Sequence, residues 1–455
     1  MTDFVGRVLR PEKDDWVIRS LLDVDFYKFT MGLFIFLLHR GVEVEFCLIN
    51  RNLKLPLADI VDEEELRRQL DHVRTLCLSR TDVVYLRGQD VYGHNMFPEN
   101  YLAFLRQLAL PEYTLRRVGN QYELKFKGSW ETVTFWETIA LAIISELFYR
   151  ALMQSMPEHE LRVLFGRAID RLYRKLEKLK TRPWIRFADF GQRRRFSFLW
   201  QRFVDQTCRE VVPQQFVGTS NTWMAFNQDL VPIGTNAHEL PMVLTALAEG
   251  DEAKRYAQYQ VLREWGGMFP QNALRIMLPD TYGSEQFFQN MPADLAEEVA
   301  ETWRGQRQDS GDPITECRRY TSWLRGYIQP ARIRSERLNI FSDGLDIDPI
   351  FEFDDQVRDE ILISNGWGTT LTNDFIDCHP RPDDRAVVRG KTLELTNRQL
   401  WRGHSIVCKV EYANGRPAVK LSNNINKATG PSKEAIAEYV RIFGNEGRAA
   451  QDVVV

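Results

Sequence analysis

Short apolar runs that end abruptly in acidic or glycine-rich turns recur along the second half of the chain, and this repeat constrains the fold more than any other feature. The runs are Ile276–Leu278, Leu338–Phe341 and Ile361–Ile363, followed by turns at Asp280–Thr281, Asp343–Gly344 and Ser364–Thr370, with a further acidic turn at Asp309–Pro313. Helix-length segments separate them, as in βα units whose strands form a parallel sheet. If the sheet closes into a barrel, these turns meet at the C-terminal ends of the strands, where such barrels hold their active sites. We therefore expect one shared pocket.

The chain length of 455 residues indicates two or three structural units rather than one core. Alternating patterns at 42–46 and 121–126 predict strands of an N-terminal α/β domain, residues 1–137. A helix from about Ile139 leads into the barrel, residues 138–381, and short strands return in residues 382–455. The predicted fold class is therefore α/β: an irregular, TIM-like α/β barrel with an N-terminal α/β domain completed by C-terminal strands.

The segment Gly234–His238 places a histidine just after a glycine turn and before an expected helix. Histidine in such a position suits chemistry, because its charge changes near neutral pH. The alternative is a partly buried structural imidazole, which is common for a lone histidine.

The run Gly366–Thr370 combines glycines, whose backbone N–H groups can approach a phosphate closely, with neighbouring hydroxyl groups. It could equally be a tight turn. Asp309, Asp312, Asp343 and Asp346 offer oxygen ligands for a magnesium-bound sugar phosphate, or act only as helix caps, the interpretation we favour for Asp312 before Pro313.

Three consecutive arginines, Arg193, Arg194 and Arg195, lie in the segment Asp189–Ser197 between two phenylalanines. They could form a nucleic-acid patch, a solvated helix face, or a turn whose arginines point to both sides to hold phosphates and carboxylates. A net charge of −4 and a pI of about 6.1 argue against a nucleic-acid surface. An anionic small molecule is the expected ligand.

Five motifs, taken in their order along the chain, resemble those of a known family. They are Asp25–Met31 (DFYKFTM), Asp189–Ser197 (DFGQRRRFS), Gly234–His238 (GTNAH), Asp309–Pro313 (DSGDP) and Gly368–Asp374 (GTTLTND). Together they resemble nicotinate phosphoribosyltransferase of the long bacterial type, a family of type II phosphoribosyltransferases, from Leu21 to about Gly430.

The resemblance implies a reaction: nicotinate and phosphoribosyl pyrophosphate give nicotinate mononucleotide and pyrophosphate, the entry step of NAD salvage. It also implies ATP hydrolysis coupled through a phosphohistidine at His238, with Mg²⁺ as a cofactor. Asp280 would orient the other ring nitrogen of His238, and its alternative role is to cap the following turn. The metal ligands stay open, with Asp309 as a candidate.

The family's motifs also assign substrate contacts. For phosphoribosyl pyrophosphate they imply Arg193, Asp309, Ser310, Asp343, Gly344, Gly368 and Thr369. For nicotinate they imply a sandwich between Tyr27 and Phe190, a carboxylate partner in Arg307, and contacts from Thr219 and Ser220. Phe190 could also be plain core.

Ser220 bears on the choice of ring. Relatives that take nicotinamide carry an aspartate there, which would repel a carboxylate substrate, so a serine favours nicotinate. Tyr27 bears on assembly, because in relatives it reaches into the neighbouring subunit, which implies a homodimer with shared active sites.

Lys409 and Lys420 lie in two strand-like segments near the C-terminus. Such lysines are mostly solvated edge residues, but the resemblance assigns Lys409 to ATP or phosphate. The chain departs from the family pattern at Gln192, Trp367 and Asn423, which leaves their effect on substrate range open.

Two alternatives remain at this point: a phosphoribosyltransferase for nicotinamide or another pyridine, and a non-catalytic protein of this fold that binds pyridine nucleotides. Scattered cysteines without metal spacing and a charged N-terminus without a signal pattern lead us to expect a cytoplasmic protein, with no membrane or nucleic-acid partner.

Overall fold

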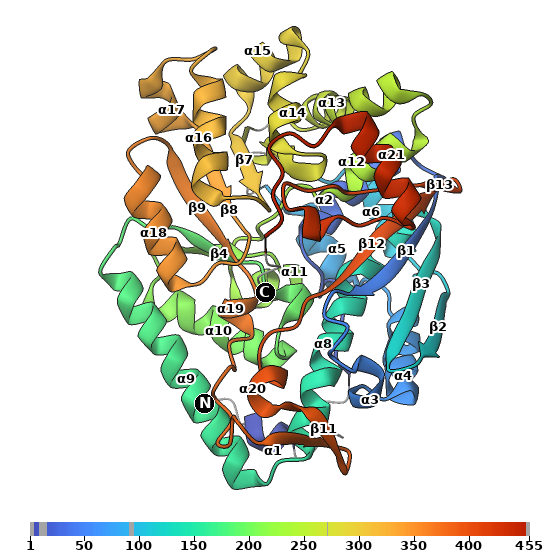
Figure 1. The fold of residues 1–455 in the computed structure, drawn as a ribbon, viewed down its shortest axis with the longest axis vertical. Coiled ribbons are helices and arrows are strands. Elements are labelled where there is room, and N and C mark those ends of the chain that lie inside the picture. Colours follow the sequence, from blue (N-terminus) through green and yellow to red (C-terminus); the bar gives the residue numbers. More distant parts are fainter. Residues whose placement is uncertain (1–3, 9–15, 91–94, 271, 452–455) are drawn as a thin grey trace.

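In the computed structural model, which describes residues 4–8, 16–90, 95–270 and 272–451, two sheets and their helices form the fold (Figure 1). The α-helices in chain order are α1 Phe4–Val8, α2 Tyr27–Leu38, α3 Leu57–Ile60, α4 Glu63–Arg74, α5 Arg80–Arg87, α6 Glu99–Arg106, α7 Trp130–Val133, α8 Trp136–Gln154, α9 Glu158–Lys180, α10 Phe198–Val211, α11 Thr222–Gln228, α12 Glu239–Leu247, α13 Asp251–Met268, α14 Ser284–Gln289, α15 Ala293–Thr302, α16 Pro313–Leu324, α17 Pro330–Glu336, α18 Ile347–Val357, α19 Thr369–Thr372, α20 Asn397–Leu400 and α21 Lys433–Phe443.

The first sheet is antiparallel and joins the two ends of the chain. Its order is β13-β12-β1-β3-β2, with β1 at Glu43–Asn50, β2 at Tyr113–Val118, β3 at Gln121–Ser129, β12 at Ile406–Ala413 and β13 at Arg416–Pro417. β1 pairs with β3 on one side and with β12 on the other, with Asn50 opposite Ile406. The C-terminal strands therefore complete the N-terminal sheet, as expected. A small hairpin of β10 (Arg385–Val388) and β11 (Lys391–Thr396) stands apart.

The second sheet is parallel and carries the turns singled out in the sequence. Its order is β5-β4-β9-β8-β7-β6, with β4 at Phe187–Asp189, β5 at Phe216–Thr219, β6 at Ile276–Met277, β7 at Gly305–Gln308, β8 at Leu338–Phe341 and β9 at Leu362–Trp367. Among the described residues, β5 and β6 do not pair with each other, so the closed TIM-like barrel that we expected is not confirmed. The segment after β5 spans that gap: Pro232 bridges to Thr219, and Asn236 donates to the carbonyl of Ile276 at 3.1 Å.

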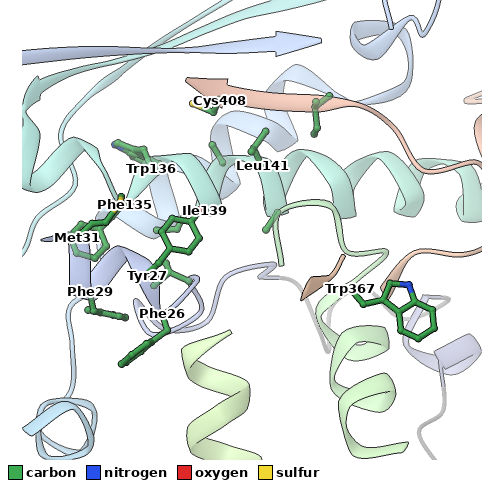
Figure 2. Packing of buried hydrophobic residues seen from close by; sticks show 14 of the residues in the cluster. Phe26, Tyr27, Phe29, Met31, Phe135, Trp136, Ile139, Leu141, Trp367 and Cys408 are labelled. Atoms are coloured by element: carbon green, nitrogen blue, oxygen red, sulfur yellow. The ribbon is translucent and has the colours of Figure 1, made fainter. Parts of the chain in front are cut away.

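Helix α8 forms the core between the antiparallel sheet and α2. Nearly all of its residues are buried, and its apolar side chains are spread around the helix, the pattern of a helix enclosed on all sides. Figure 2 shows Cys408 of β12 on one side of α8 and Tyr27 of α2 on the other. The stretch Trp130–Gln154 is long and apolar enough to cross a bilayer, but 94% of its most apolar window is buried inside the protein. It therefore serves as a core helix.

All six cysteines are free thiols, as their spacing predicted. Five of them are buried, and only Cys77 is exposed.

Candidate active site

A cavity of about 1180 Å³, including space open to solvent, lies where the C-terminal ends of β4, β7, β8 and β9 meet β12. Its lining residues are Tyr27, Arg51, Phe190, Gly191, Arg193, Arg194, Ala237, His238, Arg307, Asp309, Ser342, Asp343, Gly344, Leu345, Gly366, Gly368, Thr369, Thr370, Ser405, Val407, Lys409, Lys420 and Lys427. Three of the four polar turns predicted to meet thus line one pocket, whereas the turn at Asp280–Thr281 lies behind its wall.

Most of the residues predicted from motifs lie on this cavity, but four do not. Those on it are Tyr27, Phe190, Arg193, His238, Arg307, Asp309, Asp343, Gly344, Gly368, Thr369 and Lys409; those behind its wall are Asp280, Ser310, Thr219 and Ser220. The four outliers are all buried and engaged with other side chains.

His238 is held at both ring nitrogens. Its Nδ1 lies 2.8 Å from the hydroxyl of Thr281, and its Nε2 lies 3.1 Å from Asp309 Oδ2. Burial, reinforced by the charge of Lys420, lowers the pKa of His238 to about 4 despite the nearby carboxylates of Asp280 and Asp309. The imidazole is therefore neutral at physiological pH, the form that can accept a phosphoryl group.

Asp309 is ionised beside this histidine. Burial alone would raise its pKa, but Lys420, His238 and Arg307 hold that pKa well below its ordinary value. Lys420 Nζ lies 3.5 Å from Asp309 Oδ2. The pair places a fixed negative charge and a fixed positive charge at the cavity wall.

The neutral state of His238 predicts a pH dependence of stability. The unfolded chain binds a proton near pH 6.5 and the folded chain only near pH 4, so stability is complete above pH 6.5 and falls as the pH drops through this window. By pH 5 this group should lower the free energy of unfolding by about 2 kcal/mol. Urea unfolding at pH 7.5 and pH 5 measures this change. In His238→Asn, the free energy of unfolding should fall less between the two pH values, by about 2 kcal/mol. His159→Asn, at an exposed histidine, controls for the substitution, and equal slopes for wild type and His238→Asn would contradict the buried neutral state.

Asp280 does not occupy the position expected of it. Its Oδ1 approaches His238 Nε2 only to 3.7 Å, and its Oδ2 accepts a 2.5 Å hydrogen bond from Ser310. Thr281, the next residue, takes the Nδ1 side because the turn Pro279–Thr281 directs its hydroxyl to the ring. Ser310 accordingly anchors Asp280 instead of lining the cavity.

The three arginine side chains of the turn after β4 point to two different sides of the turn. Arg193 and Arg194 line the cavity, whereas Arg195 is fully buried in a two-pronged pair with Asp23 at 2.7 and 2.9 Å. This is the arrangement with arginines on both sides of a turn. Gly191 is required there, because a Cβ would lie 1.9 Å from Thr372 Oγ1.

Tyr27, Phe190 and Arg307, the three residues predicted to form a slot for the ring, all line the cavity, and we call them the ring slot. Tyr27 begins α2, only 4% exposed, and the backbone packs closely against it: a Cβ at Gly234 would lie 2.7 Å from Tyr27 N. Arg307, in β7, is anchored by donation to the carbonyl of Asn236 at 3.1 Å. Tyr27 therefore lines the cavity of its own chain, whereas the resemblance implies that it serves a neighbouring subunit.

Thr219 and Ser220 are directed away from this slot. Thr219 donates to Asp189 Oδ2 at 2.8 Å, and Ser220 donates to Asp25 Oδ1 at 2.5 Å. Burial raises the pKa of Asp25 to about 6, with Arg193 opposing the shift. Both hydroxyl groups are committed to buried acids, so Ser220 cannot read the ring directly.

Lys420 and Lys427 were not among the predicted site residues, and neither were Arg51 and Arg194. Lys420 is 4% exposed rather than a solvated edge lysine. Lys427 pairs with Asp343. Burial and the charges of Arg193 and Arg51 lower the pKa of Arg194, a mark of concentrated positive charge. These cations reach the cavity from the residue that follows β1, the arginine turn and the segment after β13.

The residues that depart from the family pattern do not touch the cavity. Gln192 donates to the carbonyl of Asp23, Trp367 to the hydroxyl of Thr370, and Asn423 to that of Ser284. Asp312 and Asp346 cap α16 and α18 through their side chains, which confirms capping for Asp312 and shows it for Asp346.

Seven basic side chains and two acidic ones line the cavity: Arg51, Arg193, Arg194, Arg307, Lys409, Lys420 and Lys427 against Asp309 and Asp343. Such an excess attracts anions, and loops at the ends of parallel strands suit phosphate groups. Fold and site together define an α/β enzyme of the class that acts on phosphorylated small molecules.

Comparison with known proteins identifies the group within this class. The sequence profile of the nicotinate phosphoribosyltransferase (NAPRTase) family matches residues 185–446, and that of the NAPRTase N-terminal domain matches residues 22–145. The chain belongs to the nicotinate phosphoribosyltransferase family.

Solved structures agree with this assignment. The chain is similar to nicotinate phosphoribosyltransferase from Vibrio cholerae, with 29% identity, a TM-score of 0.78 and 95% and 94% of the two chains covered. It is also similar to nicotinate phosphoribosyltransferase from Porphyromonas gingivalis, with 27% identity, a TM-score of 0.74 and 94% and 100% covered. A putative nicotinate phosphoribosyltransferase from Saccharomyces cerevisiae, 23% identical, shares the fold with a TM-score of 0.76 over 94% and 99% of the chains.

Proposed function

We propose that this nicotinate phosphoribosyltransferase joins nicotinate to phosphoribosyl pyrophosphate in the cation-lined cavity and couples the reaction to ATP hydrolysis through His238. The observation that carries the proposal is the meeting of a ring slot, seven cations and a neutral histidine in one cavity. Each part corresponds to one chemical requirement of the reaction.

The transfer needs a stabilised leaving group more than it needs an acid or a base. The pyridine nitrogen gives its electron pair to the anomeric carbon, and the bond from that carbon to pyrophosphate breaks, so that pyrophosphate leaves with the bonding electrons. Arg193, Lys409 and the other cations stabilise the charge that develops on it. Asp309 holds ribose hydroxyl groups, while the loops of Asp343–Gly344 and Gly368–Thr369 accommodate the 5′-phosphate.

The ring slot favours a planar carboxylate. Two aromatic side chains, Tyr27 and Phe190, offer faces on which a pyridine ring stacks. Arg307 supplies a guanidinium for the carboxylate, ideally through two hydrogen bonds. Arg307, and not Ser220, therefore carries the preference for nicotinate.

His238 is the proposed phosphoryl acceptor. Its Nε2 faces Asp309 and the cavity, whereas Nδ1 is engaged by Thr281. Attack by Nε2 on the γ-phosphorus of ATP would form the N–P bond as ADP leaves, and the proton that Nε2 donates to Asp309 would pass to that carboxylate. Later hydrolysis of that bond would return the neutral imidazole.

Mg²⁺ fits the carboxylates next to this histidine. His238, Asp280 and Asp309 place one ligand atom each within 4.8 Å of one another, and Asp280 Oδ1 is buried without a hydrogen-bond partner. Asp280 and Asp309 would hold the ion, which supplies positive charge for phosphate oxygens.

We also propose an irregular barrel, a three-part division of the chain and a cytoplasmic location. The segment 231–236 supports an irregular barrel, because it links β5 to β6 through Pro232 and Asn236. The three-part division at residues 137 and 381 is supported by the start of α8 at Trp136. The proposed cytoplasmic location rests on six free cysteines.

The homodimer remains a proposal from resemblance, but the cavity draws Tyr27, Phe190 and Lys420 from one chain. We therefore predict a specific activity that does not fall on dilution below the dissociation constant of any dimer. Initial rates across a thousandfold range of protein concentration, beside sedimentation at the same concentrations, check this. Activity that tracks the dimer fraction would restore the shared site.

The choice of ring is tested by comparing nicotinate, nicotinamide and quinolinate as acceptors. We predict that Arg307→Gln lowers kcat/KM for nicotinate about 10- to 100-fold by removing a charge-assisted pair, and leaves the low nicotinamide rate almost unchanged. Arg304→Gln is the matched control, because Arg304 directly precedes β7, the strand of Arg307, but does not line the cavity. Equal turnover of nicotinamide by the wild type would identify the chain as a phosphoribosyltransferase for nicotinamide. Ligand binding without pyrophosphate release would favour a non-catalytic protein.

A further inference from the structure

A buried lysine links three helices behind the cavity wall. Lys28 on α2 is fully buried, and its Nζ lies 2.7 Å from Glu137 Oε2 of α8 and 2.6 Å from Glu239 Oε2 of α12. The hydroxyl of Thr134 accepts a further hydrogen bond at 3.2 Å. We call Lys28, Glu137 and Glu239 the Lys28 cluster; none of its members lines the cavity.

Each member of the Lys28 cluster is next to a residue that does. Lys28 follows Tyr27 in the first turn of α2, and Glu239 follows His238 in the first turn of α12. Glu137 Oε1 lies 3.2 Å from Lys409 Nζ and 3.6 Å from an Arg193 nitrogen. One ammonium group therefore connects the ring slot, the phosphoryl-accepting histidine and the cations facing the leaving group.

The geometry of the Lys28 cluster is tightly fixed. Glu239 uses its second oxygen, Oε1, to accept from Trp130 Nε1 at 2.7 Å, so neither oxygen is free to turn. Lys28 holds the pKa of Glu137 below its ordinary value, together with Lys409 and Arg193, although burial opposes the shift. Buried charges are costly to separate, so a displacement of one partner is passed to the others.

Phosphorylation of His238 supplies such a displacement. A phosphoryl group on Nε2 would take the place of the 3.1 Å contact with Asp309 and would displace the ring, and with it the first turn of α12. Glu239 belongs to that turn. Such a movement would reach Lys28 through the 2.6 Å ion pair and Tyr27 through the backbone of α2.

We propose that Lys28 and Glu239 are positioning residues that transmit the phosphorylation state of His238 to the ring slot and so couple ATP hydrolysis to phosphoribosyl transfer. This inference rests on the proposed function. It requires that the ratio of the rate with ATP to the rate without ATP depends on the ion pair between α2 and α12.

The variant that tests it is Glu239→Gln, which keeps the shape and leaves Lys28 paired with Glu137. Rates are measured with and without ATP, together with the moles of ATP hydrolysed per mole of mononucleotide formed and the melting temperature. We expect the ratio of the two rates to fall at least about fivefold and ATP hydrolysed per product to rise, as expected for loss of a coupling free energy. The control is Glu438→Gln, which removes an ion pair with Lys254 between α13 and α21, away from the cavity.

A proportional loss of both rates, or an unchanged ratio, would overturn the inference, because a purely structural role lowers them together. If Glu239→Gln does not fold, Trp130→Phe removes the hydrogen bond to Oε1 together with part of a buried ring, and should lower the same ratio to a smaller extent. An unchanged ratio there would also overturn the inference. A wild type without ATP stimulation would overturn the proposed coupling itself, and this outcome is recognised before any variant is made.

Discussion

Arg193→Ala should lower kcat/KM for phosphoribosyl pyrophosphate about 10²- to 10³-fold, the usual effect of removing a preorganised group that stabilises transition-state charge. Arg193 is held at the cavity by the turn Gln192–Arg194 and lies 3.6 Å from Glu137. Most of the loss should be in kcat, because charge on pyrophosphate develops as the bond breaks. Steady-state rates of pyrophosphate release measure it.

Two matched variants sharpen this prediction. Arg193→Lys keeps the charge but loses the planar fork, so it should recover only part of the rate. Arg202→Ala, at an exposed arginine of α10, should behave as the wild type. A loss at Arg193 of less than about threefold would show that the other cations of the cavity carry the leaving group without it.

His238→Ala should abolish the ATP-stimulated part of the rate completely, so that the remaining rate is the same with and without ATP. The reason is chemical: the neutral imidazole is the only group proposed to take the γ-phosphoryl, and alanine cannot form that bond. Labelled γ-phosphate from ATP should appear on the wild type as an acid-labile, base-stable adduct and be absent from the variant. His159→Ala, at an exposed histidine, should keep both labelling and stimulation.

ATP stimulation that survives in His238→Ala would show that ATP acts elsewhere. Labelling of the variant at wild-type level would locate the acceptor on another residue. Either result would remove His238 from the proposed reaction and leave its neutral, buried state as a structural feature.

The sequence was sufficient to predict one pocket because the relevant signal is local. Apolar runs such as Leu338–Phe341 stop at polar turns, and chain direction alone places Asp343 and Asp309 at the same edge of the parallel sheet. The antiparallel strands at 42–46 and 121–126 also carried their own alternation. Local sequence patterns therefore predicted strands of both sheets and about half of the residues that line the cavity.

Residues brought in by long-range pairing had no such signal. Arg51 reaches the cavity because β1 pairs with β12, where Asn50 lies opposite Ile406, and Lys427 reaches it through the segment that follows. Neither residue lies in a periodic pattern that indicates a site. Arg51 and Lys427 could therefore be placed at the cavity only once the fold was known.

Side-chain direction was the other limit. β5 is only four residues long, and Gly218 within it has a φ of +143°, so strand alternation does not fix where Thr219 and Ser220 point. Two buried acids, Asp189 and Asp25, decide it instead. Closure of the barrel is not confirmed for a similar reason, because the segment 231–236, which lies in the gap between β5 and β6, forms an isolated bridge at Pro232 instead of a strand.

The measurement that tests the central claim most directly is the stoichiometry of one reaction with the purified wild type: nicotinate mononucleotide, pyrophosphate and ADP formed from nicotinate, phosphoribosyl pyrophosphate and ATP. We predict equal amounts of mononucleotide and pyrophosphate, release of pyrophosphate only when nicotinate is present, and ADP formed in step with both. Pyrophosphate release without nicotinate, or no mononucleotide from nicotinate, would contradict the function assigned to this cavity.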